Sequence, residues 1–350
     1  MVSKHAPTPF PIRTDSDHEE VLLCSDPTSG YLGVLAIHST VLGPAVGGTR
    51  LWPYASVEEA VADALRLSRG MTYKAAMARL PLGGGKSVIL SRSPRQGRKE
   101  LFRAHGRLVE SLGGRYITAE DVGTGPRDMQ VVRTQTRHVA GLQGVVDDPA
   151  PFTARGVLRA MQAAAMLRWS SDDLRGKTVA VQGYGRVGSQ LVRELRDVGA
   201  VPIVTDLDPR RVRRAVREHE AEVVSSDGIY DVEADILAPC ALGAVLDFET
   251  VARLRVEIVV GAANNQLRDA DAGAHLADRG ILYVPDYLAN AGGVISGCSG
   301  ILGWSRLEVS ARIDSIYETT LKVLRRAAEE ALRPEVVADR IAEKIIDSRR

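Results

Sequence analysis

Cysteine and lysine are scarce in this chain of 350 residues, and neither sign of charge is in excess. The three cysteines, Cys24, Cys240 and Cys298, form no pair with the spacing of a zinc or redox motif. Their low, odd number excludes a disulfide framework and favours a reducing cytoplasm. The 45 basic and 44 acidic residues leave a net charge of +1, which argues against a nucleic-acid or membrane-surface partner.

Long hydrophobic runs are also missing. The uncharged stretch 287–304 contains five glycines and polar residues, so it is a poor candidate for a membrane helix. The first ten residues lack the apolar segment of a signal peptide. The seven histidines show no metal-ligand spacing, and we expect no metal site. These absences predict a cytoplasmic globular protein, with a length that suits two domains.

Apolar residues alternate between strand and helix periodicity along the chain. In the second half the pattern predicts a strand at 178–182, a helix at 186–198, a strand at 202–206 and a helix at 209–219. Such alternation is typical of an α/β protein with a parallel sheet covered by helices. In the first half we predict strands at 31–40, 87–90 and 116–118 and helices at 57–77 and 98–112.

A Pro/Asp-rich segment at 147–151 indicates a hinge between two halves. We predict an N-terminal α/β catalytic and oligomerisation domain at 1–148 and a Rossmann-type dinucleotide-binding domain at 149–306. A cleft is expected between them. Helices at 307–350 are expected to pack back onto the first domain.

A glycine-rich turn in the second half carries the strongest fold signal. Gly183, Gly185 and Gly188 follow an apolar strand and open a helix, as in the G-x-G-x-x-G dinucleotide fingerprint. Asp206 ends the next strand 18 residues beyond Gly188, close to the separation of about 20 expected for a ribose ligand. Its carboxylate favours NAD over NADP, although the arginines at 210–211 could bind a phosphate.

Two lysines and an aspartate indicate chemistry in the first half. Only seven of the 45 basic residues are lysines, so a lysine in an unusual setting draws attention. Lys74 lies in an apolar helical segment, and Lys86 follows three glycines that we expect to form a turn. A lysine beside a second cation can act as a base, and Asp121, at a strand end, could exchange protons with an amine. On spacing alone, a purely structural role for all three is equally compatible with the sequence.

Eight segments spread over nearly the whole chain carry a family resemblance: 42–50, 70–74, 83–86, 119–124, 182–188, 238–241, 261–265 and 290–293. In this order they resemble the leucine, valine and phenylalanine dehydrogenases of the glutamate dehydrogenase superfamily, which also has tryptophan-acting members. The resemblance implies reversible oxidative deamination, in which an L-amino acid, NAD and water give a 2-oxo acid, ammonium and NADH. It also implies a homo-oligomer.

The same resemblance implies roles for individual residues. Lys74 would bind the substrate carboxylate with help from the Gly43 backbone. Lys86 would activate water, and Asp121 would exchange protons with the substrate nitrogen. Asn265 and Asn290 would lie near the substrate. The residues implied to contact the cofactor are Thr153, Gly183, Tyr184, Gly185, Arg186, Val187, Gly188, Asp206, Cys240, Ala241, Ala262 and Asn264.

The resemblance leaves the substrate side chain open. It places Leu42, Ala119, Val294 and Gly297 around that side chain, and the first three resemble the aliphatic-substrate enzymes. Gly297 departs from the larger apolar residue of leucine-specific relatives, so an aromatic substrate such as phenylalanine or tryptophan remains an alternative. The short acidic linker at 142–148 also departs from the family pattern. A lyase or cyclodeaminase that recycles NAD internally, and a non-catalytic dinucleotide-binding protein, are further alternatives.

Overall fold

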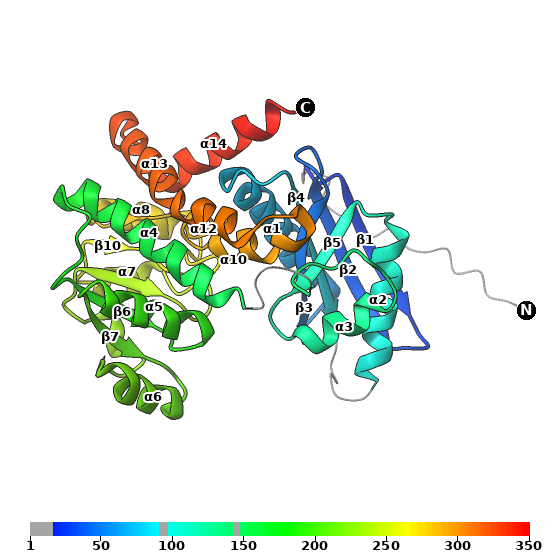
Figure 1. Ribbon diagram of the computed structural model, residues 1–350, viewed down its shortest axis with the longest axis horizontal. Coiled ribbons are helices and arrows are strands. Elements are labelled where there is room, and N and C mark those ends of the chain that lie inside the picture. Colours follow the sequence, from blue (N-terminus) through cyan, green and yellow to red (C-terminus); the bar gives the residue numbers. More distant parts are fainter. Residues whose placement is uncertain (1–16, 91–96, 143–147) are drawn as a thin grey trace, which may run out of the picture.

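The computed structural model describes residues 17–90, 97–142 and 148–350, whose strands form two sheets lying side by side (Figure 1). The first sheet has the order β1-β2-β4-β3-β5. β3 runs parallel to β4 and β5, and β2 runs antiparallel to β1 and β4. Its strands are β1 (Glu20–Asp26), β2 (Tyr31–Ser39), β3 (Ala45–Trp52), β4 (Gly83–Leu90) and β5 (Tyr116–Glu120).

Helices cover both faces of the first sheet because side chains alternate along its strands. On β2, Val34 and Ala36 belong to a buried cluster with α1 (Val57–Met77). Leu35 and Ile37 point to the other face, where α2 (Arg98–Ser111) packs. α3 (Pro126–Arg133) packs against α2. The predicted helix over 57–77 is therefore confirmed.

The second sheet is parallel throughout, with the order β11-β10-β9-β6-β7-β8. This confirms the predicted α/β fold class, although the short strand β8 was not predicted. Its strands are β6 (Thr178–Gln182), β7 (Val201–Thr205), β8 (Glu222–Val223), β9 (Ile236–Pro239), β10 (Ile258–Val259) and β11 (Leu282–Tyr283). The accompanying helices are α4 (Ala150–Trp169), α5 (Arg186–Asp197), α6 (Pro209–His219), η1 (Gly228–Tyr230), α7 (Phe248–Arg253) and α8 (Ala270–Asp278).

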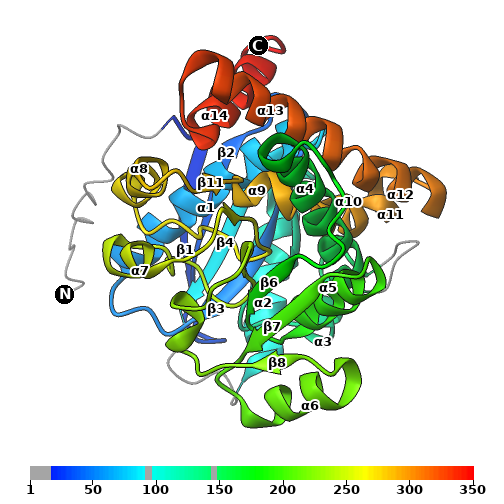
Figure 2. The same ribbon diagram turned by 90° about the vertical axis from the view of Figure 1, so that its left-hand side faces the viewer.

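A run of helices follows the second sheet and returns to the first. α13 and α14 lie along the same edge of the molecule in both views (Figures 1 and 2). α14 packs against α1, where Tyr73 Oη donates a 2.7 Å hydrogen bond to Glu343. In the described part of the chain, no helix is both long and apolar enough to cross a membrane. The run comprises α9 (Asp286–Ala289), α10 (Gly292–Gly297), α11 (Ser299–Leu302), α12 (Arg306–Asp314), α13 (Ile316–Glu330) and α14 (Pro334–Asp347).

The expectation that the three glycines before Lys86 form a turn is wrong. Gly83, Gly84 and Gly85 are the first residues of strand β4, so Lys86 lies within the strand. A Cβ at Gly84 would come within 2.1 Å of the Thr72 backbone nitrogen, and one at Gly85 within 2.8 Å of the Tyr116 ring. The glycines therefore serve close packing between β4 and its neighbours rather than a change of direction.

Replacing Gly47 in β3 with alanine should destabilise the protein by at least about 2 kcal/mol, because the added Cβ would meet backbone rather than a movable side chain. That Cβ would lie 1.8 Å from the Gly85 carbonyl oxygen. Chemical denaturation of Gly47→Ala against the parent chain measures the effect. The matched control is Gly70→Ala in α1, whose Cβ would meet nothing within 4 Å and which should be neutral or stabilising by up to about 1 kcal/mol. Equal stability of the two variants would contradict this account.

Candidate active site

Lys86 and Asp121 form a close ion pair on the first sheet, across the intervening strand β3. Lys86 is carried by β4 and Asp121 directly follows β5, and both strands flank β3. The Lys86 Nζ lies 2.7 Å from Asp121 Oδ2, and the lysine side chain is only 7% exposed. Burial opposes ionisation of the carboxyl, but the charges of Lys86 and Arg50 lower the pKa of Asp121 to about 2. Asp121 is therefore a carboxylate at neutral pH.

Lys74 approaches the same space from the last turn of α1. Its Nζ donates a 2.9 Å hydrogen bond to Asn264 Oδ1, which belongs to the other half of the chain. The same oxygen accepts a 2.9 Å bond from Asn290 Nδ2. Burial, reinforced by the nearby Lys86 charge and opposed by Asp286, lowers the pKa of Lys74 to about 8. The amine with the lowered pKa is thus the one expected to bind carboxylate.

A cavity of about 410 Å³ lies between the two halves and contains these groups. The sequence-predicted residues that line it are Lys74, Lys86, Ala119, Asp121, Asn264, Asn265, Val294 and Gly297. Other predicted residues lie elsewhere. Leu42 lines a second groove beside α12–α14. The Gly43 amide donates to Thr40 O at 2.9 Å.

Sequence reasoning missed several residues of this cavity, among them Arg50, Met71, Met129, Asp286, Tyr287 and Cys298. Asp286 is the most consequential of the group, because it is buried and faces Lys74 without a direct bond. Its carboxylate accepts from the backbone amides of Gln266 at 3.1 Å and Tyr287 at 2.6 Å. Burial raises its pKa, against the Lys74 charge. The sequence signal for Asp286 was its position directly after the apolar segment 281–285.

The glycine fingerprint has the shape of a dinucleotide cradle. Gly183 has φ of +103°, and a Cβ at Gly188 would lie 1.9 Å from the Gly183 carbonyl oxygen. At Gly185, which precedes α5, the nearest atom to a Cβ would be 3.8 Å away, and no side chain caps the helix. The free amides of this helix N-terminus fit a pyrophosphate. Asp206 accepts from the Tyr184 amide at 2.7 Å, which fixes its carboxylate beside the loop.

The remaining predicted cofactor contacts surround this loop and the cavity. Thr153 Oγ1 donates to Pro149 O at 2.9 Å in the first turn of α4. Burial raises the pKa of the Cys240 thiol to about 12, so the thiol is not an activated nucleophile. Ala241 packs against Gly183, and Ala262 O accepts from Asn290. Val187 and Arg186 begin α5. Most of the predicted linker, residues 143–147, lies outside the described residues.

Arg186 also reaches across to the first half. Its Nη2 donates to Asp148 at 2.8 Å, and its Nη1 lies 3.6 Å from Glu120. These pairs are exposed, so each contributes little to stability. Within the described residues, no group of three or more His, Cys, Asp or Glu side chains is arranged to hold a metal ion.

Comparisons with known proteins agree with this geometry. Residues 18–138 match the model of the Glu/Leu/Phe/Val dehydrogenase dimerisation domain, and residues 207–344 match that of Glutamate/Leucine/Phenylalanine/Valine dehydrogenase. A leucine dehydrogenase of Thermoactinomyces intermedius is 48% identical over 95% of this chain and 92% of its own length. A valine dehydrogenase of Streptomyces coelicolor is 48% identical over 93% of this chain and 92% of its own length.

Among solved structures, the L-tryptophan dehydrogenase of Nostoc punctiforme superposes with a TM-score of 0.83. It is 41% identical, and the match covers 95% of this chain and 97% of that one. The match therefore extends over both halves of the chain. The chain belongs to the glutamate, leucine, phenylalanine and valine dehydrogenase family, whose members are amino acid dehydrogenases that use a nicotinamide dinucleotide.

Proposed function

We propose that this chain catalyses the reversible, NAD-dependent oxidative deamination of an apolar L-amino acid to its 2-oxo acid and ammonium. One observation carries the proposal: the Lys86–Asp121 pair shares a 410 Å³ cavity with Lys74, at the junction of the two halves. A buried base, a carboxylate and a second cation are the groups that this chemistry needs. Leucine and valine are the first substrates to test, because dehydrogenases of these names share about half of the sequence.

Substrate orientation is the task of Lys74. In the proposed complex the substrate carboxylate replaces Asn264 as the partner of the Lys74 ammonium, and Asn264 and Asn265 stay close by. The carboxylate keeps Lys74 protonated above the pKa of about 8 that the lysine has without substrate. The substrate amine is then directed toward Asp121. Enclosure between the two halves excludes bulk water, which strengthens these charge interactions.

Proton transfer is the task of Asp121 and Lys86. The nicotinamide dinucleotide, held by the glycine loop before α5 and by Thr153, would supply the acceptor for the hydride on the substrate Cα. Asp121 takes a proton from the substrate ammonium group before the hydride leaves, and it returns that proton to the nitrogen when ammonia departs. Lys86, as the neutral amine, takes a proton from the water that attacks the imine carbon and later releases that proton to solvent. The 2.7 Å contact between Lys86 Nζ and Asp121 Oδ2 keeps both groups beside the reacting atoms.

The cofactor site fits NAD through its glycines and Asp206. The uncapped N-terminus of α5 would hold the pyrophosphate, with Tyr184 and Val187 beside it, and Thr153 would hold the nicotinamide amide. Asp206 would accept from the ribose 2′-hydroxyl and repel a 2′-phosphate. Arg211 lies 3.4 Å from Asp206, so the positive charge of Arg211 is already partly compensated by that carboxylate.

We also propose the domain division 1–148, 149–306 and 307–350, with the last segment returning to the first. The packing of α14 on α1 supports this division. Homo-oligomerisation is supported by the match to a family dimerisation domain. A cytoplasmic location is supported by the three cysteines, all free in this structure.

Absorbance at the NADH band tests the reaction directly. The protein is mixed with NAD and L-leucine, L-valine, L-phenylalanine, L-tryptophan or L-glutamate at alkaline pH. We expect NADH formation with an apolar amino acid, and a loss of 10²-fold or more in kcat for Lys86→Ala or Asp121→Asn because proton transfer is removed. Lys177→Ala is the matched control, since Lys177 forms a 2.8 Å pair with Asp235 away from the cavity.

Two outcomes would count against this reaction. Undiminished turnover by Lys86→Ala would refute the assigned base. Substrate consumption without net NADH would favour a lyase that recycles its cofactor, and no turnover with any substrate would favour a binding-only role.

Cofactor choice is tested at Asp206. Asp206→Asn keeps a hydrogen-bonding side chain beside the loop but removes the charge that repels a 2′-phosphate. We expect the ratio of kcat/KM for NAD over NADP to fall by about tenfold or more. The matched variant is Asp208→Asn, which removes a carboxylate paired with exposed Arg210. An unchanged ratio in Asp206→Asn, or an equal fall in both variants, would contradict the proposed role.

A second substrate class is favoured by one local observation. A Cβ added at Gly297 would meet nothing within 4 Å, although the residue lines the cavity. This open space could accept an aromatic side chain, and a tryptophan dehydrogenase is among the structural relatives.

Filling this space should shift side-chain preference. We expect Gly297→Ala and then Gly297→Val to lower kcat/KM for phenylalanine or tryptophan relative to leucine by a factor that grows with size, to about tenfold or more. Competing steady-state assays on the same preparations measure the ratio. A ratio that is indifferent to both substitutions would show that Gly297 does not border the substrate side chain.

A further inference from the structure

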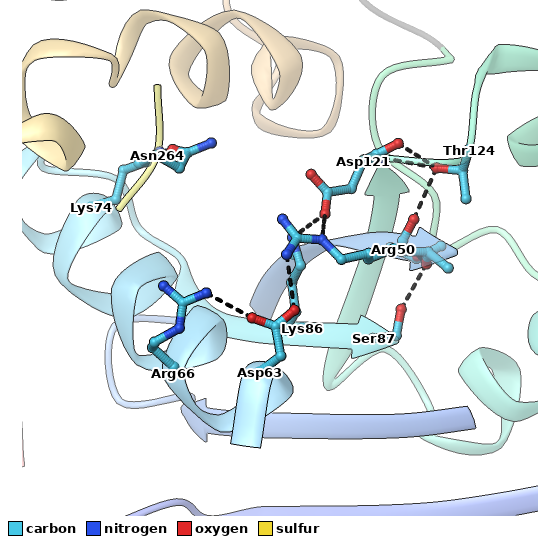
Figure 3. Close-up of polar contacts among 12 residues, drawn as sticks. Arg50, Asp63, Arg66, Lys74, Lys86, Ser87, Asp121, Thr124 and Asn264 are labelled. Carbon is cyan, nitrogen blue, oxygen red and sulfur yellow. Dashed lines mark hydrogen bonds and ion pairs between the residues drawn. The ribbon is translucent and has the colours of Figure 1, made fainter. Parts of the chain in front are cut away.

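Arg50 connects the candidate active site to helix α1 (Figure 3). It lies on β3, between the strands that carry Lys86 and Asp121. Its Nε donates a 3.0 Å bond to Asp121 Oδ2, and its Nη1 donates a 2.9 Å bond to Asp63 Oδ2. The guanidinium thus bridges two carboxylates from different elements, with its side chain 19% exposed.

The second carboxylate, Asp63, is itself held firmly. Its Oδ2 also accepts a 2.5 Å bond from Tyr54 Oη, and its Oδ1 accepts a 2.7 Å bond from Arg66. Its side chain is only 13% exposed. Because Tyr54 and Arg66 hold the Asp63 carboxylate in place, the Arg50 guanidinium bonded to it has little freedom to rotate. Planar two-sided contacts of this kind require arginine rather than lysine.

The two cations beside Asp121 converge on one of its oxygens. Lys86 and Arg50 both contact Oδ2, and Figure 3 shows the other carboxylate oxygen turned away from both. In the proposed mechanism Lys86 takes a proton from water, so its side chain alternates between a neutral amine and an ammonium during the cycle. A guanidinium stays protonated throughout. Arg50 is therefore the constant charge against Asp121 while Lys86 changes its state.

We propose that Arg50, anchored by Asp63, is a positioning residue that fixes Asp121 through one carboxylate oxygen and leaves the other free for the substrate nitrogen. This rests on the proposed function, in which Asp121 exchanges protons with that nitrogen. Arg50 acts through Asp121 and takes no part in bond breaking.

The pH dependence of the reaction should report this role. The charged and titratable groups around Asp121 are Lys86 from β4, Arg50 from β3, Lys74 from α1 and Tyr116 from β5. Loss of the Arg50 charge removes one of the two cations that hold the pKa of Asp121 low, so that pKa rises. A carboxylate that must be ionised loses activity as the pH falls through its pKa. The acidic limb of the pH profile should therefore move to higher pH.

The test compares Arg50→Gln, Arg50→Lys and Asp63→Asn with the parent enzyme, each with cofactor and the best substrate. We expect Arg50→Gln to lower kcat by about 100-fold and to raise the acidic limb of kcat/KM by about one pH unit. Arg50→Lys and Asp63→Asn should give smaller changes in the same direction. Arg50→Lys keeps the positive charge but loses the planar geometry, and Asp63→Asn keeps a hydrogen-bonding side chain but loses the charge that anchors Arg50. The substrate KM should change much less than kcat.

Arg253→Lys is the matched structural control. Arg253 also bridges two aspartates, with bonds of 2.9 Å to Asp227 and 2.6 Å to Asp231, but it lies on α7 in the second half. We expect it to retain parental kcat and pH profile even if its thermal unfolding midpoint falls. Should Arg50→Gln fail to fold, the two milder variants decide the question.

The outcomes separate this inference from the proposed function. If the parent enzyme does not deaminate any substrate, the proposed function fails. If the parent is active and all the folded Arg50 and Asp63 variants keep its kcat and acidic limb, Arg50 is structural and the inference is overturned. A loss of kcat without any movement of the limb would also overturn it.

Discussion

The site depends on the close approach of three neighbouring strands, β4, β3 and β5. Gly47 leaves room for the carbonyl of Gly85, and Gly48 leaves room for the backbone of residue 120. With side chains at these glycines the strands could not stay in register, and Lys86, Arg50 and Asp121 would no longer lie side by side. The close packing of backbone against backbone in these strands explains how three charged groups are held within hydrogen-bonding distance while largely screened from water.

Sequence patterns predicted much of this architecture because the periodic signals were strong. The structure starts and ends α1 at the predicted residues 57 and 77, and Ser56 accepts a hydrogen bond from the Glu59 amide as its N-cap. The glycines before Lys86 lie in a strand although a glycine run is more often a turn, because close neighbours such as Thr72 and Tyr116 leave no room for side chains there. The grouping of Lys74, Lys86 and Asp121 in one cavity was anticipated from lysine scarcity and family resemblance. Arg50 and Asp286 were missed because arginine is abundant here and their importance comes from tertiary contacts between distant segments.

Polar contacts cross between the two halves inside the cavity, beside a buried apolar cluster that also spans them. Lys74 from α1 meets Asn264 from the second half, and Asn264 is in turn held by Asn290. Asn265 adopts a left-handed backbone with φ of +52°. The carboxylate of Asp286 accepts a hydrogen bond from the backbone amide of Gln266, the residue after Asn265. In the proposed complex the substrate would lie between these polar groups on one side and Lys86 and Asp121 of the first sheet on the other.

The return of α14 to α1 has a consequence for how the molecule is made. Tyr73, next to Lys74, bonds to Glu343, which lies 270 positions later in the chain, and Tyr287, next to Asp286, bonds to Asp339. A ribosome therefore adds 270 residues after Tyr73 before the partner of Tyr73 is made. During synthesis the N-terminal sheet can fold early, but this side of α1 stays uncovered until α14 has emerged. Newly made chains would therefore hold a folded but incomplete site, and the interval before α14 docks is the period in which they are most exposed to association with one another.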